Sequence, residues 1–195
     1  MVRNSGNASG AILKVSSTVS EIEGVMFIKA EHSTDSRGRF LKFQPADLLN
    51  ERMNSVAVSI NPKVGTVRGI HLQVEPFAEE KIITCIQGST FEAIVDVRPN
   101  SKSFGMVATF KLSQESAEQV YLPKGIAHGF QTLLPNTILQ YFLTSQFSPE
   151  SSYAIDPFGD LGIEWPINER IVSEKDARGV TFEFAAQRYA NSLNI

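Results

Sequence analysis

From residue 25 onward, short β-prone apolar runs alternate with clusters of Gly, Pro, Asn and Asp. Such punctuation is typical of strands joined by tight turns. Within residues 90–97, more and less apolar positions alternate with a period of two, as in a strand that packs one face on a core. The pattern predicts strands over residues 25–30, 39–43, 55–60, 65–71, 81–87, 89–97, 105–112, 118–122, 129–134 and 137–144.

Helices are few in this pattern. Residues 45–51 and part of 181–193 have helical character, and residues 11–15 resemble an edge strand within a polar start. Gly88 and Ser89 separate two apolar runs, and because glycine tolerates the positive φ of a two-residue turn, we expect a hairpin there. Many short strands with few helices predict an all-β sandwich or barrel, but this pattern does not separate a jelly roll from an immunoglobulin-like sandwich.

Length and composition narrow the class of protein. A chain of 195 residues fits one domain whose core needs no disulfide or metal. Its 18 Lys and Arg against 21 Asp and Glu give a net charge of −3, which argues against a nucleic-acid partner but allows a local basic pocket. The single Cys85 excludes an internal disulfide and fits a reducing compartment. Since no apolar stretch approaches the roughly 18 residues of a membrane span, and the polar start lacks a signal core, we expect a cytoplasmic protein.

Three histidines are candidates for acid–base chemistry, because imidazole changes its protonation state near neutral pH. We favour a structural role for His32, which lies near an expected loop. For His128, in a turn rich in Pro and Gly, and for His71, at the end of a predicted strand, structural and functional roles are both open. Gly69, two residues before His71, would let a ligand approach the backbone. Strand alternation predicts one face with Arg68, Ile70 and Leu72, and another with Val67, Gly69, His71 and Gln73.

The patterns of common cofactor sites are missing from the sequence. Metal-binding barrels often use two histidines one residue apart, whereas Leu72 and Gln73 follow His71, so we expect no transition metal. A glycine-rich phosphate loop of the Walker or dinucleotide type does not occur either, and we expect no cofactor. Cys85, inside an apolar run, is interpreted as a buried hydrophobe rather than a nucleophile.

Several segments together resemble one family in their order and spacing. They are SRGRF (36–40), VRGIHLQ (67–73), EKII (80–83), GSTFEAIVDVR (88–98), SFG (103–105), LPKGIAHGF (122–130), Tyr141, LGIEWP (161–166) and SEKD (173–176). The RGxH and PxGxAHGF segments in combination are highly specific. The chain resembles the dTDP-4-dehydrorhamnose 3,5-epimerases over about residues 24–178. The resemblance implies a cupin-like jelly roll over residues 23–178, after a flexible extension (1–22) and before a helical tail (179–195).

The resemblance also implies a reaction, the inversion of C3, C5 or both in a nucleotide-activated 4-keto-6-deoxyhexose, whose ketone acidifies both positions. The family's roles fall on His71 as base, Asp176 as its carboxylate partner, Tyr141 as acid on the opposite face and Lys81 as the cation beside the enolate oxygen. Implied substrate-binding residues are Arg37, Arg68, Gln73, Asn61, His128 and Gln146. The implied substrate is dTDP-linked, and the implied assembly is a homodimer with exchanged N-terminal strands.

Local sequence offers a structural interpretation for each of these residues. Asp176 could cap a helix, Tyr141 could be plain core within its apolar strand, and Lys81 could be a solvated charge on an edge strand. Asp96 and Arg98 are interpreted as a structural ion pair rather than as part of a site.

Departures from the family gather at positions that recognise substrate. They are Ser59 for a common Gln, Lys42 for an acidic residue, Gln146 where an aromatic side chain often covers the substrate, and Val107 near a common tryptophan. These changes predict a different sugar or base, or epimerisation at one carbon. Alternative functions are a nucleotide-sugar 3,4-ketoisomerase, a non-catalytic sugar-binding jelly roll and a metal-dependent cupin oxygenase, the last disfavoured by the few histidines.

Overall fold

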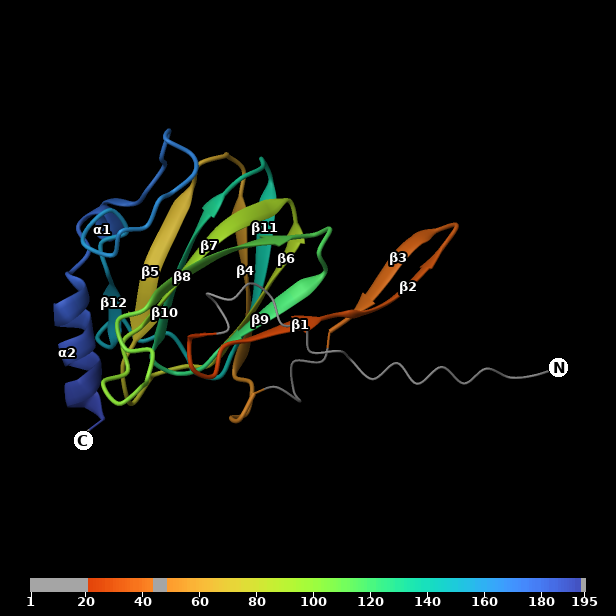
Figure 1. The fold of residues 1–195 in the computed structure, drawn as a ribbon. Helices are drawn as coiled ribbons and strands as arrows, with labels where there is room; N and C mark the ends of the chain where they lie inside the picture. Colours follow the sequence, from red (N-terminus) through yellow and green to blue (C-terminus); the bar gives the residue numbers. More distant parts are fainter. Residues whose placement is uncertain (1–20, 44–48, 194–195) are drawn as a thin grey trace.

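The computed structural model describes residues 21–43 and 49–193, and two antiparallel five-stranded sheets form its body (Figure 1). The first sheet contains, in spatial order, β1 (Met26–Lys29), β9 (Glu118–Leu122), β6 (Lys81–Gln87), β11 (Thr137–Leu143) and β4 (Ser55–Asn61). The second contains β12 (Ser152–Ala154), β5 (Val67–Gln73), β10 (Ile126–Thr132), β7 (Ser89–Asp96) and β8 (Val107–Ser113). A separate hairpin of β2 (Glu31–Asp35) and β3 (Gly38–Lys42) projects from this body (Figure 1). The predicted all-β fold is confirmed as a cupin-like jelly roll.

Two large apolar layers, together with a smaller cluster of Ile82, Tyr121 and Phe142, hold the sheets in place. The layer between the sheets is built from alternating inward side chains such as Leu139 and Phe130, and from Phe27 and Phe110, whose rings meet edge to face at 4.8 Å. A second layer covers the outer face of the sheet that contains β5, where the C-terminal part of the chain packs around the buried Trp165. Burial on both of its faces makes this second sheet a rigid support for side chains that point inward.

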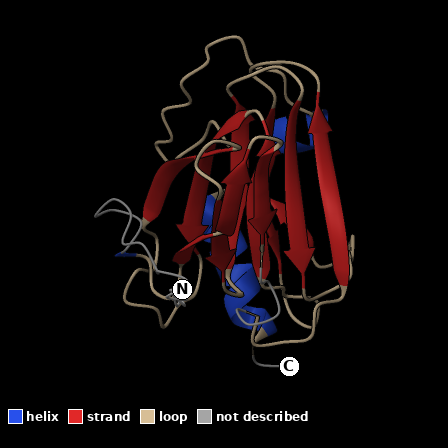
Figure 2. Cartoon of the chain, turned by 90° about the vertical axis from the view of Figure 1, so that its right-hand side faces the viewer, coloured by secondary structure: helices blue, strands red, loops and turns tan. Residues whose placement is uncertain are grey.

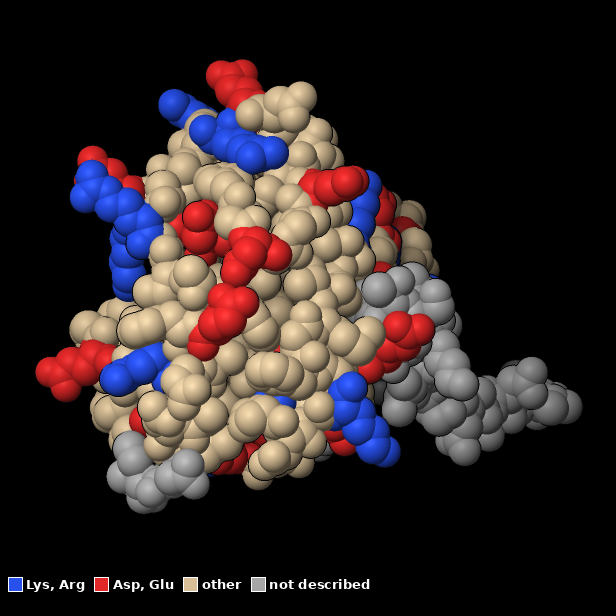
Figure 3. Space-filling model, turned by 60° about the vertical axis from the view of Figure 1, so that its left-hand side comes forward, with Lys and Arg blue, Asp and Glu red and all other residues tan. Residues whose placement is uncertain are grey.

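The C-terminal helix α2 (Phe182–Ser192) belongs to that outer layer and confirms the helix predicted within residues 181–193 (Figure 2). Its N-cap is Thr181, whose side chain accepts a hydrogen bond from the Phe184 backbone N–H. Ala185, Ala186 and Tyr189 form its buried stripe at helical spacing. On the side of the molecule shown in Figure 3, acidic and basic side chains are interspersed over a largely uncharged surface.

The hairpin predicted at Gly88 is wrong. β6 and β7 belong to different sheets, and Gly88 is the point at which the chain crosses between them. Its φ is +79°, and a Cβ atom built there would lie 2.4 Å from the Thr137 hydroxyl oxygen, so glycine is required for the crossing. The positive φ expected of Gly88 is present. Local sequence does not tell, however, whether the strands on either side of a turn pair with each other.

Other local predictions have mixed outcomes. β2, β12 and the short helix α1 (Glu174–Ala177) were not predicted. The edge strand at 11–15 lies outside the described residues, as does most of the helix at 45–51, and Leu49–Glu51 are not helical. Among the described residues, no helix is long and apolar enough to cross a membrane.

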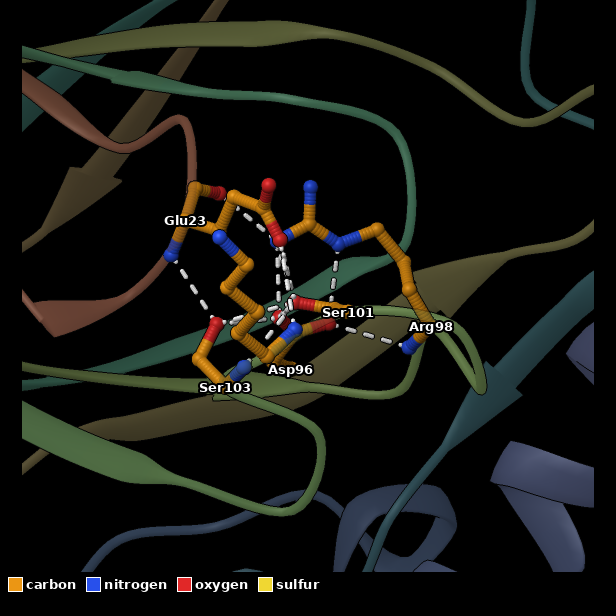
Figure 4. A network of polar contacts seen from close by, with 6 residues as sticks. Glu23, Asp96, Arg98, Ser101 and Ser103 are labelled. Carbon is orange, nitrogen blue, oxygen red and sulfur yellow. Dashed lines mark hydrogen bonds and ion pairs between the residues drawn. The ribbon is translucent and has the colours of Figure 1, made fainter.

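A buried carboxylate ties the start of the described chain to the loop between β7 and β8 (Figure 4). Asp96 is 0% exposed and accepts hydrogen bonds from Arg98 Nε and Nη2 at 2.9 and 2.7 Å, and from the hydroxyls of Ser101 and Ser103 at 2.6 and 2.7 Å. Glu23 joins through its backbone, donating to Ser103 and accepting from Arg98. Burial alone would raise the pKa of Asp96, but these hydrogen bonds lower it below its ordinary value. The structural ion pair of Asp96 and Arg98 is confirmed.

Asp96→Asn should lower the free energy of unfolding by about 2–4 kcal/mol, because Arg98 would be left without its charged partner. Urea unfolding followed by fluorescence of Trp165, the single tryptophan, measures this loss. The difference from wild type should shrink as the pH falls below the unfolded carboxyl pKa of about 3.9, because protonation removes the same charge. Asp160→Asn at an exposed position is the control, and an equal effect of both substitutions would contradict the assignment.

Candidate active site

A cavity of about 240 Å³ opens between the two sheets, and three of the four predicted catalytic residues line it. β5 contributes His71, β6 contributes Lys81 and β11 contributes Tyr141. The remaining lining residues are Ala57, Leu72, Gln73, Glu79, Leu143, Phe147, Ser152 and Lys175. Side chains from five strands, two loops and the short helix at residues 174–177 therefore converge on one space, although they are far apart in the sequence.

Asp176, the fourth predicted catalytic residue, lies directly behind His71. Its Oδ1 atom is 2.8 Å from His71 Nε2, and its Oδ2 atom accepts a 3.2 Å hydrogen bond from the Gly69 backbone N–H. The Asp176 side chain is 7% exposed, whereas the His71 side chain is 43% exposed and reaches the cavity. The structural interpretation of Asp176 as a helix cap is wrong, because Ser173 caps α1 and Asp176 lies within the helix.

The charge of Asp176 determines which tautomer the His71 imidazole adopts. Burial alone would raise the pKa of Asp176, but hydrogen bonds from His71, Gly69 and Ser173 lower it, so the carboxylate is charged at neutral pH. A carboxylate only accepts hydrogen bonds, and His71 Nε2 must therefore carry the proton. Nδ1 is left with the lone pair that can take up a proton, and the imidazolium formed would be stabilised by the adjacent charge.

A bulge in β5 decides which side chains face the cavity, and it overturns the predicted faces. His71 pairs with His128 and Arg68 pairs with Phe130, so three residue steps along β5 match two along β10. β5 therefore contains one extra residue here, which is a β-bulge. Val67 therefore packs with Ile70 and Leu72 in the outer layer, and Arg68 lies on the same side as His71. The extra residue is Gly69, at φ +115°, where a Cβ atom would come within 2.5 Å of the Gly129 backbone. The space predicted for a ligand beside Gly69 is filled by Gly129.

Lys81 is not the solvated edge charge that local sequence allowed. It begins β6, which has a neighbour on each side, and its side chain is 10% exposed. Its ammonium group lies 3.3 Å from Glu79 Oε1, and both residues line the cavity. A buried ammonium group at this place can donate hydrogen bonds to a polar oxygen of a ligand.

Tyr141 and His128 lie next to each other, with ring centroids 6.3 Å apart. Loss of solvent around the Tyr141 hydroxyl raises its pKa well above the ordinary value, helped by the charge of Glu92, so the phenol stays protonated at neutral pH. His128 Nε2 lies 2.6 Å from Glu92 Oε2, and both side chains are buried. Burial lowers the pKa of His128 despite this carboxylate. His128 thus adjoins His71 on the neighbouring strand without lining the cavity.

The predicted substrate-binding residues are spread over different places. Gln73 lines the cavity, but its side chain holds the following loop by donating to the carbonyls of Phe77 and Gln146 and accepting from the Ser148 N–H. Gln146 itself is exposed beside the cavity and does not line it. The buried Asn61 accepts a 2.9 Å hydrogen bond from Arg68 Nε.

Arg68 and Arg37 lie outside the main cavity. Arg68 lines a second hollow of about 280 Å³, on which Asp176 also borders. Arg37 is at the tip of the β2–β3 hairpin, where it pairs with Asp35 at 2.6 Å and is 88% exposed. Within one chain the structure does not bring Arg37 to the cavity.

Sequence reasoning missed three charged or aromatic residues of the cavity: Glu79, Phe147 and Lys175. Glu79 is two residues before Lys81, and strand alternation would have placed both on one face. Phe147 directly follows the Gln146 position at which an aromatic residue was expected, and its side chain shares the rim with Lys175, whose ammonium lies 5.9 Å from the ring centre. No signal in the sequence distinguished Lys175 from an ordinary surface charge.

Two remaining expectations concern the reactivity of Cys85 and the binding of metal ions. Cys85 is 3% exposed, and burial raises the pKa of its thiol to about 12, which confirms the interpretation as a buried hydrophobe. Within residues 21–43 and 49–193, no group of three or more His, Cys, Asp or Glu side chains is arranged to hold a metal ion.

Comparison with known proteins extends these findings. The family model described as dTDP-4-dehydrorhamnose 3,5-epimerase matches residues 19–183. A dTDP-4-dehydrorhamnose 3,5-epimerase of Sinorhizobium fredii is 35% identical over 80% of this chain and 84% of its own length. A dTDP-4-dehydrorhamnose 3-epimerase of Streptomyces niveus is 32% identical over 80% and 78%.

A solved structure agrees with the fold. The 3,5-epimerase of Legionella pneumophila, described in complex with dTDP-4-keto-L-rhamnose, superimposes with a TM-score of 0.81 at 29% identity and covers 92% of this chain and 96% of that one. The family match spans the whole jelly roll and both sides of the cavity. This chain therefore belongs to the dTDP-4-dehydrorhamnose 3,5-epimerase family of carbohydrate isomerases.

Proposed function

We propose that the protein inverts C3, C5 or both in a dTDP-linked 4-keto-6-deoxyhexose, without a cofactor, in deoxysugar biosynthesis. The observation that carries this proposal is the convergence of His71, Lys81 and Tyr141 on one cavity, with Asp176 hydrogen-bonded behind His71. The ligand named for the Legionella structure supports a nucleotide sugar. Both a 3,5-epimerase and a 3-epimerase are among the relatives, and an exchange experiment decides between one carbon and two.

The residues match the needs of the reaction one by one. A C4 ketone makes the hydrogens on C3 and C5 acidic, because the electron pair left behind delocalises onto the ketone oxygen. His71 Nδ1 takes the proton, and Asp176 stabilises the resulting imidazolium. Lys81 stabilises the enolate oxygen by donating hydrogen bonds from a largely buried position. Tyr141 returns a proton to the opposite face of the ring, since its raised pKa keeps the phenol protonated until then.

In deuterated water, the protein should exchange the C3 or C5 hydrogens, or both, of dTDP-4-keto-6-deoxyglucose, as read by NMR. His71→Ala should slow exchange by about 10³-fold or more, because the base is gone. Asp176→Asn should slow it by about 10²–10⁴-fold, because an amide can donate to Nε2 and favour the wrong tautomer.

Asp160→Asn, at an exposed position that does not line the cavity, is the matched control for the charge change. Circular dichroism should report an intact fold for every variant. Near-normal exchange by His71→Ala would overturn the mechanism. Movement of the ketone from C4 to C3 by an enzyme that tolerates Asp176→Asn would instead indicate a ketoisomerase.

Tyr141→Phe should separate deprotonation from inversion. His71 still removes the proton in this variant and can return a deuteron to the same face, so label enters the substrate. Formation of the epimer should fall by about 10²–10³-fold, because no acid remains on the opposite face. NMR follows label and configuration in one sample, and a wild-type rate of epimer formation would exclude Tyr141 as the acid.

We propose that the protein acts as a homodimer in which Arg37 serves the partner's site. Two features support this proposal. The β2–β3 hairpin projects from the body (Figure 1). Its residues Arg37 and Phe40 are 88% and 69% exposed, and neither lines the chain's own cavity. The edge strand β4 exposes Val56, Val58 and Ile60, and an exposed apolar edge is a surface that proteins normally cover.

A mixture of two impaired variants, assayed at low substrate concentration, tests the exchange of Arg37. Arg37→Ala alone should lower kcat/KM by about 10–100-fold, because a charge-assisted contact to phosphate oxygens is lost. A heterodimer of Arg37→Ala and His71→Ala would contain one site with both residues intact. After subunit exchange, half of the dimers are mixed and one of their two sites works, so roughly a quarter of wild-type activity should return. If Arg37 acts in its own chain, mixing restores nothing.

A further inference from the structure

Glu79 is a carboxylate inside the cavity that the proposed mechanism does not use. Its side chain is 11% exposed, and Oε1 lies 3.3 Å from the ammonium of Lys81. Within the described part of the chain, Lys81 is its sole hydrogen-bond or ion-pair partner. One carboxylate oxygen thus engages Lys81, and the group as a whole keeps acceptor capacity toward the cavity.

The backbone around Glu79 fixes both side chains toward the cavity. Glu79 and Lys81 share one face of the extended chain, and Glu80 between them points to the other. Glu80 is clamped there, because it accepts hydrogen bonds from Asn50 Nδ2 at 2.6 Å and from the Tyr121 hydroxyl at 2.8 Å. The Glu80 backbone also pairs with Thr144 on both its N–H and its C=O. The Glu79 carboxylate, which accepts hydrogen bonds, and the Lys81 ammonium, which donates them, are therefore held as a fixed pair in the cavity.

The chemistry of this pair selects a ligand group. A nearly buried carboxylate repels phosphate oxygens and accepts hydrogen bonds from hydroxyl groups. Lys81 beside it donates to an acceptor oxygen. Such a donor and acceptor lie about a hydrogen-bond length apart. They complement a ligand with a carbonyl and a hydroxyl on adjacent carbons, because the carbonyl oxygen can accept from the donor while the nearby hydroxyl donates to the acceptor.

We propose that Glu79 is a specificity-determining residue that accepts a hydrogen bond from the sugar hydroxyl next to the ketone, while Lys81 donates to the ketone oxygen. This inference rests on the proposed function. In a 4-keto-6-deoxyhexose the hydroxyl-bearing neighbour of C4 is C3, since C5 carries the methyl group. The Glu79–Lys81 pair thus recognises the C3 hydroxyl, orients the ring with C3 toward Glu79, and senses the configuration that the reaction changes at C3.

The test measures binding of unreactive ligands, so that it does not depend on catalysis. Isothermal titration compares dTDP-6-deoxyglucose with its 3-deoxy and 2-deoxy forms on wild type, Glu79→Ala and Glu79→Gln. Wild type should lose about 10–100-fold in affinity when the 3-hydroxyl is removed, the range of a hydrogen bond to a charged group. Glu79→Ala should bind the parent ligand about 10–100-fold more weakly and be indifferent to the 3-hydroxyl. Glu79→Gln, which keeps an acceptor oxygen, should retain part of the preference.

Controls separate this role from a structural one. Removal of the 2-hydroxyl should cost the same in wild type and Glu79→Ala, and Glu164→Gln, exposed outside the cavity, should behave as wild type. An equal cost of losing the 3-hydroxyl in wild type and Glu79→Ala would overturn the proposal while leaving the epimerase function in place. If wild type binds none of the three dTDP sugars, the proposed function and the role of Glu79 both fail. Should neither variant fold, an unchanged wild-type affinity for the 3-deoxy ligand is enough to overturn it.

Discussion

The site depends on one hydrogen bond, the 2.8 Å contact between His71 and Asp176, which joins residues 105 positions apart. Asp176 reaches His71 because α1, which is capped by Ser173, lies against β5, and the Gly69 N–H holds the second carboxylate oxygen. This position in turn requires the C-terminal part of the chain to pack on the outer face of the second sheet, around Trp165 and α2. The outer apolar layer therefore supports the candidate active site, because it sets where the Asp176 carboxylate can lie.

Two opposing effects act on that carboxylate, and their balance decides the chemistry. Burial disfavours a charge, and a lone buried carboxyl would become neutral. Three hydrogen bonds outweigh burial at Asp176, and the same competition has the same outcome at Asp96. The two sites differ in what the charge faces. Asp96 is enclosed by Arg98 and serine hydroxyls and stabilises the fold, whereas Asp176 faces an imidazole that is open to the cavity and can change its protonation state.

Much of the fold follows from the sequence, because period-two alternation and turn residues report directly on strands and their ends. The predicted strands at 55–60, 81–87 and 118–122 nearly coincide with β4, β6 and β9. Predictions failed where the outcome depends on distant contacts. Gly88 allows a hairpin or a crossing between sheets, and Thr137, remote in sequence, occupies the space beside it. In β5, the bulge at Gly69 follows from its close contact with Gly129 on β10, and it reverses which side of the strand Arg68 occupies. Only the family resemblance could predict that His71, Lys81 and Tyr141 belong to one site, because no local sequence pattern connects residues that come together through folding.

The departures from the family pattern acquire a physical meaning when they are placed around the cavity. Ser59 lies on β4 and contacts Asn61, which in turn holds Arg68, so this change alters the support of a cation beside the second hollow. Gln146 is exposed and does not line the cavity, whereas the next residue, Phe147, does. These changes leave untouched His71, Lys81 and Tyr141, which line the cavity, and fall instead on residues around them. Glu79 places a carboxylate next to Lys81 in the same cavity, and among the described residues Lys175 is the other Lys or Arg that lines it. Because a carboxylate repels anionic groups, we expect such groups of a ligand to lie nearer to Lys175 than to Glu79. The distribution of charge along the cavity is therefore expected to orient a ligand, before any contact to a particular base or sugar is considered.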